Sequence, residues 1–591
     1  MSLLSISSRR AAALAILLTA SGCSLLGARG SGTGDPLLQA DQTVTIDEGD
    51  LKGAARADSH YLKALVARNN GDFKKALHEM LDAAALDPSQ PRIREGLVEL
   101  YVRNGDLNAA VDQALALRDL RPEEPEHRLI AADLLASLGR VDEAVQEYDR
   151  LLELAPDSEE VMVKLGALYI SQARYKDAID ILSKASTVSP DSFIVQFYLG
   201  RAYGLSGKYE ESLRCYKRAA QLNPSSDQVY LEMGFVYEQQ GRKDRAVETY
   251  KKALEFNPQL LPARRQLGGL YVSEGKLDDA LKQYEELIGL EEDPLSTQTK
   301  IGLISLERGD FNRAAMEFSM VLGARPKDQD VRFYLAITYH ELGDANAAEE
   351  QLLQIPADSE RYMDARIHLA QIYFETGRPE KAVESVQALL KVDADNPRGL
   401  RYLVELYESQ QKYDKALEYA HRLVAVEPKN DEYLYRLAWV YEKSGERDKA
   451  IAVLRQVIEI NPDNGPALNF LGYTFAERGE NLDEAERLIR RAMELHPNDG
   501  FFVDSLGWVY YQRGDYKNAA RELERASKLA GGDPIINEHL ADAYVKLGRS
   551  EDAVRVYRDC EARTEDADQR QRVTNKLLKL QGRAETIPSG I

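Results

Sequence analysis

Residue types that commonly carry out chemistry are scattered through this chain of 591 residues rather than grouped. The eight histidines stand at positions 60, 78, 127, 340, 368, 421, 496 and 539, without an HExxH pair or a Cys–His spacing typical of zinc. The sequence also has no GxSxG elbow, P-loop or glycine-rich dinucleotide turn. Asp393, Asp395 and Asn396 begin like a calcium loop, but Pro397 and Arg398 follow where ligands and a glycine are needed. We therefore predict a chain that is not an enzyme and that holds no metal and no cofactor.

The charge and the cysteines narrow the classes of partner further. The formal net charge is −21 and the isoelectric point is near 5.1, which argues against nucleic acid because phosphate binding depends on Lys and Arg. Of the three cysteines, Cys215 and Cys560 lie too far apart along the chain to form a disulfide in a repeat structure. We expect both to be small buried residues.

The third cysteine offers a different chemistry. Arg9 and Arg10 precede a short apolar stretch over residues 11–20, and Ser21, Gly22 and Cys23 follow. This pattern is typical of a signal peptide over residues 1–22, and it resembles a bacterial lipobox, whose cysteine is diacylated and becomes the mature N-terminus. The resemblance implies a membrane partner through a lipid anchor on Cys23. Cleavage near Gly22 without lipidation is the alternative.

The residues that follow the cysteine suggest where such an anchor would hold the chain. Ser24 stands where Asp would resemble the inner-membrane retention signal of enteric bacteria, so we expect an outer-membrane lipoprotein that faces the periplasm. Residues 23–56 comprise this cysteine and a segment rich in glycine. We predict that the segment is a flexible linker with an end-to-end distance of about 30 Å.

One small residue returns every 34 positions through most of the chain, with one residue inserted before position 485. The series is Ala76, Ala110, Ala144, Ala178, Ser212, Ala246, Ala280, Ala314, Ala348, Ala382, Ala416, Ala450, Ala485, Ala519 and Ala553. A period that keeps its phase this long indicates one supersecondary unit stacked about 15 times. The function of such a stack is expected in a surface rather than in a catalytic pocket.

Other residues recur in phase with the alanine. Tyr stands nine residues before it in most copies, Gly stands five residues before it, and Pro often follows twelve residues after it. This pattern resembles the tetratricopeptide repeat, a hairpin of two helices. The resemblance implies an all-α fold, a right-handed superhelical solenoid of about 15 hairpins over residues 57–567. A capping helix and a disordered tail are expected over residues 568–591.

The recurring residues also have a physical interpretation. Two apolar runs at helical spacing in each unit predict two amphipathic helices. The glycine between them is expected to end the first helix in a left-handed conformation. Small alanines allow the two helices to approach closely, and Pro prevents the second helix from continuing.

Large aromatic residues stand at places that stacking does not explain. The resemblance implies that first helices line the concave face, where the second, fifth, ninth, twelfth and thirteenth residues of a repeat contribute side chains. The candidates for partner binding are Phe197, Phe235, Phe333, Tyr435, Trp439, Tyr473, Trp508 and Tyr511. Trp and Tyr are common binding hot spots. The alternative is that each ring packs against a neighbouring helix.

Three segments resemble a narrower group of proteins. They read LNFLGYTFAERG at 468–479, LDEA at 482–485 and DSLGWVYY at 504–511. They are similar to proteobacterial lipoproteins that include the adaptor of a periplasmic carboxyl-terminal processing protease. The resemblance implies a scaffold that brings this protease to peptidoglycan hydrolases. Two alternatives stay open, namely an assembly component of an exopolysaccharide or pilus export machine, and an enzyme subunit whose active site lies in a partner.

Overall fold

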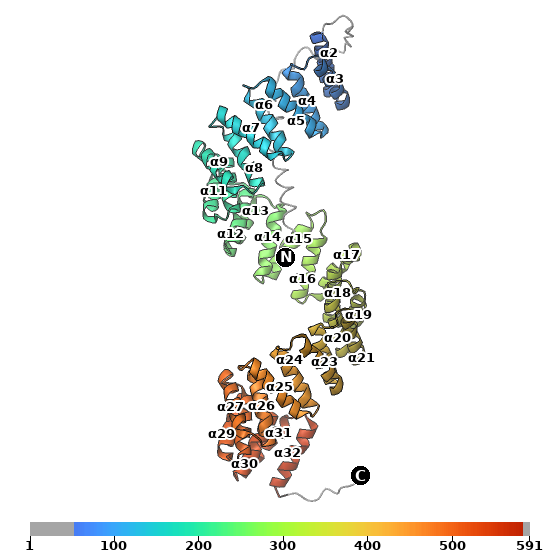
Figure 1. Ribbon diagram of the computed structural model, residues 1–591, viewed down its shortest axis with the longest axis vertical. Helices are drawn as coiled ribbons and strands as arrows, with labels where there is room; N and C mark the ends of the chain where they lie inside the picture. The colour runs from blue at the N-terminus through green and yellow to red at the C-terminus, as the bar shows by residue number, and fades with distance from the viewer. Residues whose placement is uncertain (1–52, 583–591) are drawn as a thin grey trace. The chain divides into compact units, whose positions relative to one another are not determined.

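The computed structural model describes residues 53–582 (Figure 1). Over these residues the chain forms 31 helices and no strand, which confirms the predicted all-α solenoid of helical hairpins. The signal peptide, Cys23, almost all of the linker and residues 583–591 lie outside the described residues. Among the described helices, none is both long enough and apolar enough to cross a membrane.

The helices belong to two compact units, which divide between Ile304 and Ser305, inside α16 (Leu295–Glu307). The helices of the first unit are α2 (Gly53–Asn69), α3 (Phe73–Leu86), α4 (Pro91–Asn104), α5 (Leu107–Leu120), α6 (Pro125–Ser137), α7 (Val141–Leu154), α8 (Glu159–Ser171), α9 (Tyr175–Val188), α10 (Phe193–Leu205), α11 (Tyr209–Leu222), α12 (Asp227–Gln239), α13 (Lys243–Phe256), α14 (Leu261–Ser273) and α15 (Leu277–Ile288).

The second unit continues with the same alternation of first and second helices. Its helices are α17 (Phe311–Ala324), α18 (Gln329–Glu341), α19 (Ala345–Leu353), α20 (Tyr362–Glu375), α21 (Pro379–Val392), α22 (Pro397–Ser409), α23 (Tyr413–Val426), α24 (Asp431–Lys443), α25 (Arg447–Ile460), α26 (Gly465–Arg478), α27 (Leu482–Leu495), α28 (Gly500–Gln512), α29 (Tyr516–Leu529), α30 (Pro534–Lys546), α31 (Ser550–Arg563) and α32 (Ala567–Leu580).

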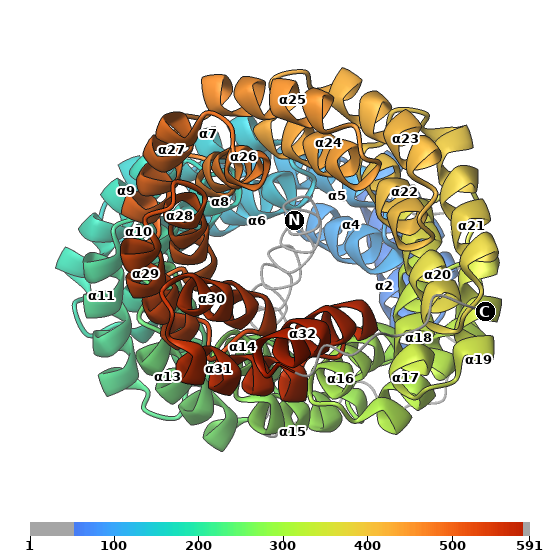
Figure 2. The same cartoon turned by 90° about the horizontal axis from the view of Figure 1, so that it is seen from below.

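Within each unit, the first helices of the hairpins lie on the inner side of a curved stack. Neighbouring first helices contact one another directly, as α8, α10 and α12 do in the first unit and α26, α28 and α30 do in the second. Elements on the inside of a curve lie closer together than those on the outside. Figure 2 shows the same arrangement in the second unit, where α25 and α27 lie outside α24 and α26. The first helices therefore line the inner side of each unit.

The recurring small residue is fully buried in every hairpin, as predicted. Small residues on the first helices also allow the two helices of a hairpin to approach closely. In the hairpin of α12 and α13, a Cβ atom added to Gly234 would lie 2.3 Å from Cε1 of Tyr250. The Tyr250 ring therefore occupies the space that the missing side chain leaves, and the two helices pack at the distance that glycine permits.

The turn between the two helices of a hairpin is left-handed, as predicted. Gly105, for example, has a φ of 80° at the end of α4. The same register position carries other residues in two hairpins, and Ala173 and Gln411 adopt φ values of 57° and 56° there. The turn geometry is therefore imposed by the hairpin even where the residue type disfavours it.

The last helix and the cysteines complete the packing. Val573 and Leu577 of α32 are buried, and Nζ of Lys576 lies 2.6 Å from Oδ2 of Asp542 on α30. Cys560 is fully buried against the same core. Cys215 is only partly buried, so the expectation of a buried cysteine was wrong there. The reason is its place on α11, next to Tyr216, whose ring takes the core position.

Candidate functional site

All eight predicted aromatic residues lie on first helices. Phe197 and Phe235 are on α10 and α12, Phe333 is on α18, Tyr435 and Trp439 are on α24, Tyr473 is on α26, and Trp508 and Tyr511 are on α28. The structure brings some of these together in the second unit and uses others for packing.

Of the two candidates in the first unit, Phe197 belongs to the core and Phe235 packs against it. Phe197 is only 9% exposed, and its ring centroid lies 5.6 Å from that of Tyr198 and 5.9 Å from that of Tyr216. Phe235 is partly buried and meets the ring of Tyr250 edge-on at 5.8 Å. Phe197 is therefore almost fully covered, whereas Phe235 is covered in part by its contact with Tyr250.

Phe333 lies in a separate cluster near the start of the second unit. Its ring meets His368 at 6.2 Å, and the His368 ring lies 5.0 Å from that of His340. Nε2 of His340 is 2.8 Å from Oε2 of Glu375. Burial and the neighbouring His340 lower the pKa of His368 to about 4, so this imidazole is neutral near pH 7.

The candidates on α24 meet a ring from the next hairpin. Phe470 on α26 contacts Tyr435 at 6.1 Å and Trp439 at 5.8 Å, both edge-on. Trp439 remains 38% exposed, and Nζ of Lys443 lies 4.6 Å from its ring centroid. Phe470 thus joins Tyr435 and Trp439 into one aromatic cluster. Phe470 was not among the candidates predicted from the sequence.

Trp508 forms the centre of a second cluster. Its ring stacks on Tyr511 with centroids 4.6 Å apart and planes 4° apart, and on His539 of α30 at 4.2 Å. Nδ1 of His539 donates a hydrogen bond to Oδ1 of the buried Asp504, at 2.9 Å. The indole N–H of Trp508 is buried without a hydrogen-bond partner in the described residues. The Trp508 ring is thus held between Tyr511 and His539, and the Asp504 carboxylate orients the histidine.

The charges around this stack shift two pKa values. Burial alone would lower the pKa of His539, but the Asp504 carboxylate, with Asp542 and Glu538, raises it above its ordinary value. Burial raises the pKa of Tyr473, and the nearby Glu477 and Asp504 carboxylates add to this effect. The raised pKa widens the pH range in which His539 is cationic, and a cationic imidazole stacks well on an indole face.

Two exposed apolar residues lie on the same two helices as the Trp508 cluster. Phe501 on α28 and Ile535 on α30 are each 54% exposed. Phe501 precedes Trp508 by two helical turns, so both lie on one face of α28, and α28 contacts α30 directly. We name Trp439, Phe470, Phe501, Trp508, Tyr511 and Ile535 the C-terminal apolar surface.

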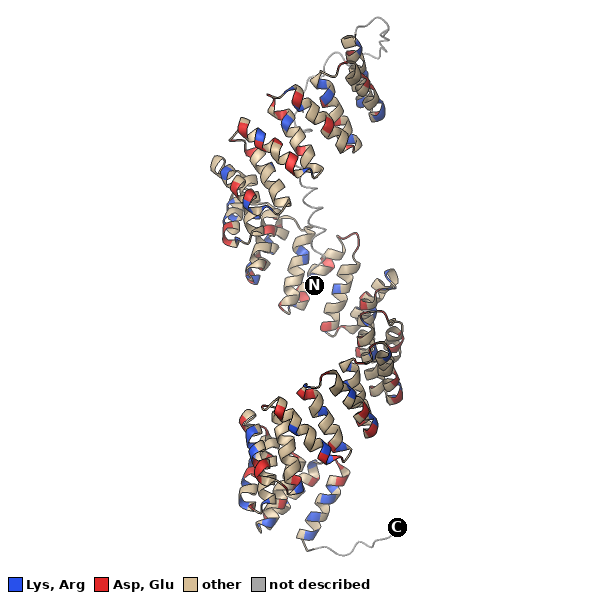
Figure 3. Ribbon diagram, viewed as in Figure 1, with Lys and Arg blue, Asp and Glu red and all other residues tan. Residues whose placement is uncertain are grey.

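The sequence analysis missed Phe501 and Ile535 although a signal was present. Each is the second residue of its 34-residue repeat. In the preceding repeats of the second compact unit, this position carries Asp330, Asp364, Arg398, Glu432 and Pro466. An apolar residue at a place that is otherwise polar or proline indicates a local role. Basic and acidic residues are interleaved along the helices of both compact units (Figure 3).

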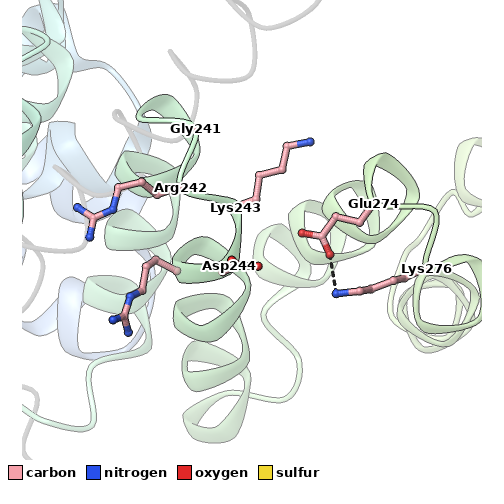
Figure 4. A pocket seen from close by; sticks show the side chains of 7 residues that line it. Gly241, Arg242, Lys243, Asp244, Glu274 and Lys276 are labelled. Carbon is pink, nitrogen blue, oxygen red and sulfur yellow. Dashed lines mark ion pairs between the residues drawn. The ribbon is translucent and has the colours of Figure 1, made fainter.

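One open hollow on the surface of the first unit is lined by charged side chains. It measures about 690 Å³ and lies between residues 241–245, at the start of α13, and Glu274 and Lys276 (Figure 4). Nζ of Lys276 pairs with Oε2 of Glu274 at 2.9 Å, and Nζ of Lys243 donates a hydrogen bond to Ser273 Oγ at 3.0 Å. Lys276 and Lys243 are thus both used in contacts with neighbouring surface residues.

One group of possible metal ligands occurs among the described residues, in the first hairpin. His60, Glu79 and Asp82 bring their ligand atoms within 4.8 Å of one another. Nδ1 of His60 lies 2.7 Å from Oε2 of Glu79 and 3.9 Å from Oδ2 of Asp82. The geometry is that of a histidine paired with carboxylates, which accounts for the cluster without an ion.

Family models identify the repeat. Models described as tetratricopeptide repeat match residues 61–117, 95–159, 135–196, 228–260, 305–362, 367–433, 408–472 and 505–567, and one described as TPR repeat matches 200–241. These matches cover most of the hairpins described above. The chain therefore belongs to the tetratricopeptide repeat family.

Proteins of known structure that are similar to this chain include the following three. MamA is 28% identical over 27% of this chain and 94% of its own, with a TM-score of 0.26. Yeast Tom70 is 15% identical over 72% of this chain and 96% of its own, with a TM-score of 0.34. A tetratricopeptide repeat protein from Parabacteroides merdae is 18% identical over 48% and 99%, with a TM-score of 0.31. The sequence matches no curated protein.

Proposed function

We propose that this chain is a non-enzymatic protein-binding scaffold whose binding site is the C-terminal apolar surface. The observation that carries the proposal is the exposure of Phe501 on α28 and Ile535 on α30, the same two first helices that carry the stacked rings of Trp508 and His539. A solenoid of tetratricopeptide hairpins is a scaffold for protein–protein interaction. In the C-terminal apolar surface, large apolar side chains are exposed although the packing of the hairpins does not require them.

The energetics support binding at this place. Covering the exposed half of a Phe or Ile side chain stabilises a complex by about 1 kcal/mol each. The Trp508 ring is already ordered by Tyr511 and His539, so little side-chain entropy is lost when a partner covers it. The ring edges of the Trp439 cluster add a second contact area on α24 and α26. A partner that spans both clusters would find preorganised aromatic anchors.

The proposed location is the periplasmic face of the outer membrane, with Cys23 as the lipid anchor. The support is the sequence from Arg9 to Ser24. Metabolic labelling with an alkyne palmitate analogue tests the lipid anchor. Cys23→Ser should abolish the label, and Cys215→Ser should leave the labelling unchanged. Equal labelling of all three proteins would contradict an anchor at Cys23.

We further propose that the chain recruits a periplasmic carboxyl-terminal processing protease together with its cell-wall hydrolase substrates. The support is the resemblance in residues 468–479 and 504–511. These segments contain Phe470, Trp508 and Tyr511, so half of the C-terminal apolar surface lies in the part of the sequence that resembles the protease adaptor. In this role the chain brings two proteins together and performs no chemistry itself.

In-cell photocrosslinking tests the scaffold function and the partner together. A photoreactive residue would replace Trp439 or Phe501, and Met320, which is exposed on the second helix α17, would be the control position. Recovery of a protease and cell-wall hydrolases from positions 439 and 501 alone is the expected result. Export-channel components would instead favour the assembly role, and capture equal to that at position 320 would contradict a binding surface here.

A further inference from the structure

Helix α32 carries a line of basic side chains in the same register as the C-terminal apolar surface. Arg572, Lys576 and Lys579 stand at the fifth, ninth and twelfth places of the 34-residue repeat, and Lys576 is in register with Trp508. They lie on one side of the helix because they are four and three residues apart. Asp568, in the first turn, is the only acidic residue of α32. We name Arg572, Lys576 and Lys579 the basic stripe.

The packing of the hairpins does not require the basic stripe. In the first helices from α18 to α30, Lys or Arg occupies the same three places only once, at Arg401. The face of α32 that a following second helix would cover is a different one. It includes Asn575, which is in register with Gly507 at a helix contact, and the exposed Leu578. This end face carries neutral residues, so the stripe is not explained as a polar cap.

Two carboxylates of α30 lie beside the basic stripe and are already engaged. Nζ of Lys576 lies 2.9 Å from Oε1 of Glu538 and 2.6 Å from Oδ2 of Asp542. Glu538 also pairs with Arg572 at 3.6 Å, and its side chain is only 10% exposed whereas that of Arg572 is 58% exposed. Lys579 is exposed and has no ion-pair partner among the described residues. The positive charge of the stripe therefore faces solvent, and the negative charge beside it is covered.

The basic stripe and the C-terminal apolar surface adjoin on α30. Ile535 belongs to the apolar surface, and Asp542 lies seven residues later on the same side of α30, where it pairs with Lys576. Trp508 reaches α30 through its stack on His539. Packed helices lie about 8–10 Å apart, so α28 and α32 are about 16–20 Å from each other. An extended segment of about six residues spans this distance.

We propose that the partner of the C-terminal apolar surface carries an acidic segment that lies against the basic stripe. The inference rests on the proposed scaffold function, because it assigns the chemistry of the partner which that function requires. Apolar side chains of the partner cover Trp508 and Ile535. Asp or Glu side chains about six extended residues away pair with Arg572 and Lys579. Exposed cations of this kind steer a complementary partner, so the stripe selects acidic partners over neutral ones.

In-cell photocrosslinking from two positions of the full-length chain tests the acidic segment. A photoreactive residue at position 501 reports on the apolar surface. One at position 545 reports on the stripe, because the exposed Val545 is in register with Lys579. Peptide mass spectrometry should show that both positions capture neighbouring segments of one partner, and that the segment at position 545 has an excess of Asp and Glu.

The outcomes separate this inference from the scaffold function. Capture at position 501 with no capture at position 545 would overturn the acidic segment and leave the scaffold function in place. A neutral or basic segment, lipid or nucleic acid at position 545 would do the same. No capture at either position would overturn both proposals.

Charge-reversal variants test whether the cations are responsible. Arg572→Glu with Lys579→Glu should reduce the crosslink yield from position 501 about threefold or more. Arg521→Glu with Lys528→Glu is the matched control and should change the yield less than twofold, because the same residue types at the same spacing are exposed on the second helix α29. Arg572→Lys with Lys579→Arg keeps both charges and should retain the yield. Circular dichroism would verify that all variants keep the helical array. Equal losses in the two reversal variants would contradict a role of the stripe.

Discussion

The imidazole of His539 stacks on the indole of Trp508 with 4.2 Å between the ring centroids, although the two residues belong to successive hairpins. Asp504, one turn before Trp508 on α28, accepts the hydrogen bond that orients this imidazole. The contact thus fixes the ring at the centre of the C-terminal apolar surface and ties α28 to α30.

We expect His539 to titrate above its ordinary range. Because Asp504 raises the folded-state pKa, the pair stabilises the fold fully below about pH 6.5, the ordinary His pKa, and this contribution is lost as pH rises through the folded pKa. NMR of ¹³C-labelled histidine, assigned with His539→Gln, measures the value. Asp504→Asn should lower it. A wild-type pKa below 6.5 would contradict the ion pair.

His368 should behave in the opposite way. Its folded pKa of about 4 lies below the value in the unfolded chain, so the unfolded state takes up a proton that the native state refuses. Stability is therefore present above about pH 6.5 and falls as pH decreases toward 4. His368→Gln should make the melting temperature less sensitive to pH between 6.5 and 4. An unchanged slope would show that His368 is not the group responsible.

Gly234→Ala should destabilise the hairpin of α12 and α13. The added methyl group would lie 2.3 Å from the Tyr250 ring, and overpacking of this kind costs about 1–3 kcal/mol. Faster hydrogen exchange in both helices is the expected readout. Gly269→Ala on α14 is the matched control, since the nearest atom would be 3.8 Å away, and it should stabilise its helix by about 0.5–1 kcal/mol. Equal effects at the two positions would contradict the packing account.

The hairpins could be predicted because the same contacts recur every 34 residues. The buried alanine and the left-handed glycine both report a local geometry that each copy repeats, so their positions indicate the fold. The left-handed Ala173 and Gln411 follow from the register alone, since their residue types give no such signal. The features that recur in every hairpin could therefore be predicted from the sequence.

The candidate site was only partly predictable because it depends on contacts that do not repeat. Trp508 and Tyr511 were predicted from their register positions. His539 was missed, because its partner Asp504 lies 35 residues earlier and residue types vary at both positions. Phe197 was predicted as a surface residue, yet Tyr198 and Tyr216 cover it. Whether an aromatic ring on the inner side is covered depends on the size of its neighbours in the adjacent hairpin.

Ala173→Gly and Gln411→Gly should each stabilise the array. Both residues hold a left-handed conformation that costs a side chain about 1 kcal/mol relative to glycine. Slower hydrogen exchange in the helices on either side of each turn is expected, together with a higher melting temperature. Gly207→Ala at the same register position should have the reverse effect. A destabilising result for both glycine substitutions would mean that the side chains contribute more than the turn costs.

The most direct test of the scaffold account is the affinity of the carboxyl-terminal processing protease of the same organism for purified variants of this chain. Trp439→Ala with Phe501→Ala should weaken binding at least tenfold, about 1.4 kcal/mol or more, because both side chains are exposed anchors. Met316→Ala with Met320→Ala on the outer helix α17 should change it less than twofold. Equal affinities of the two double variants, or no binding by the wild-type chain, would contradict the proposal that this surface recruits the protease.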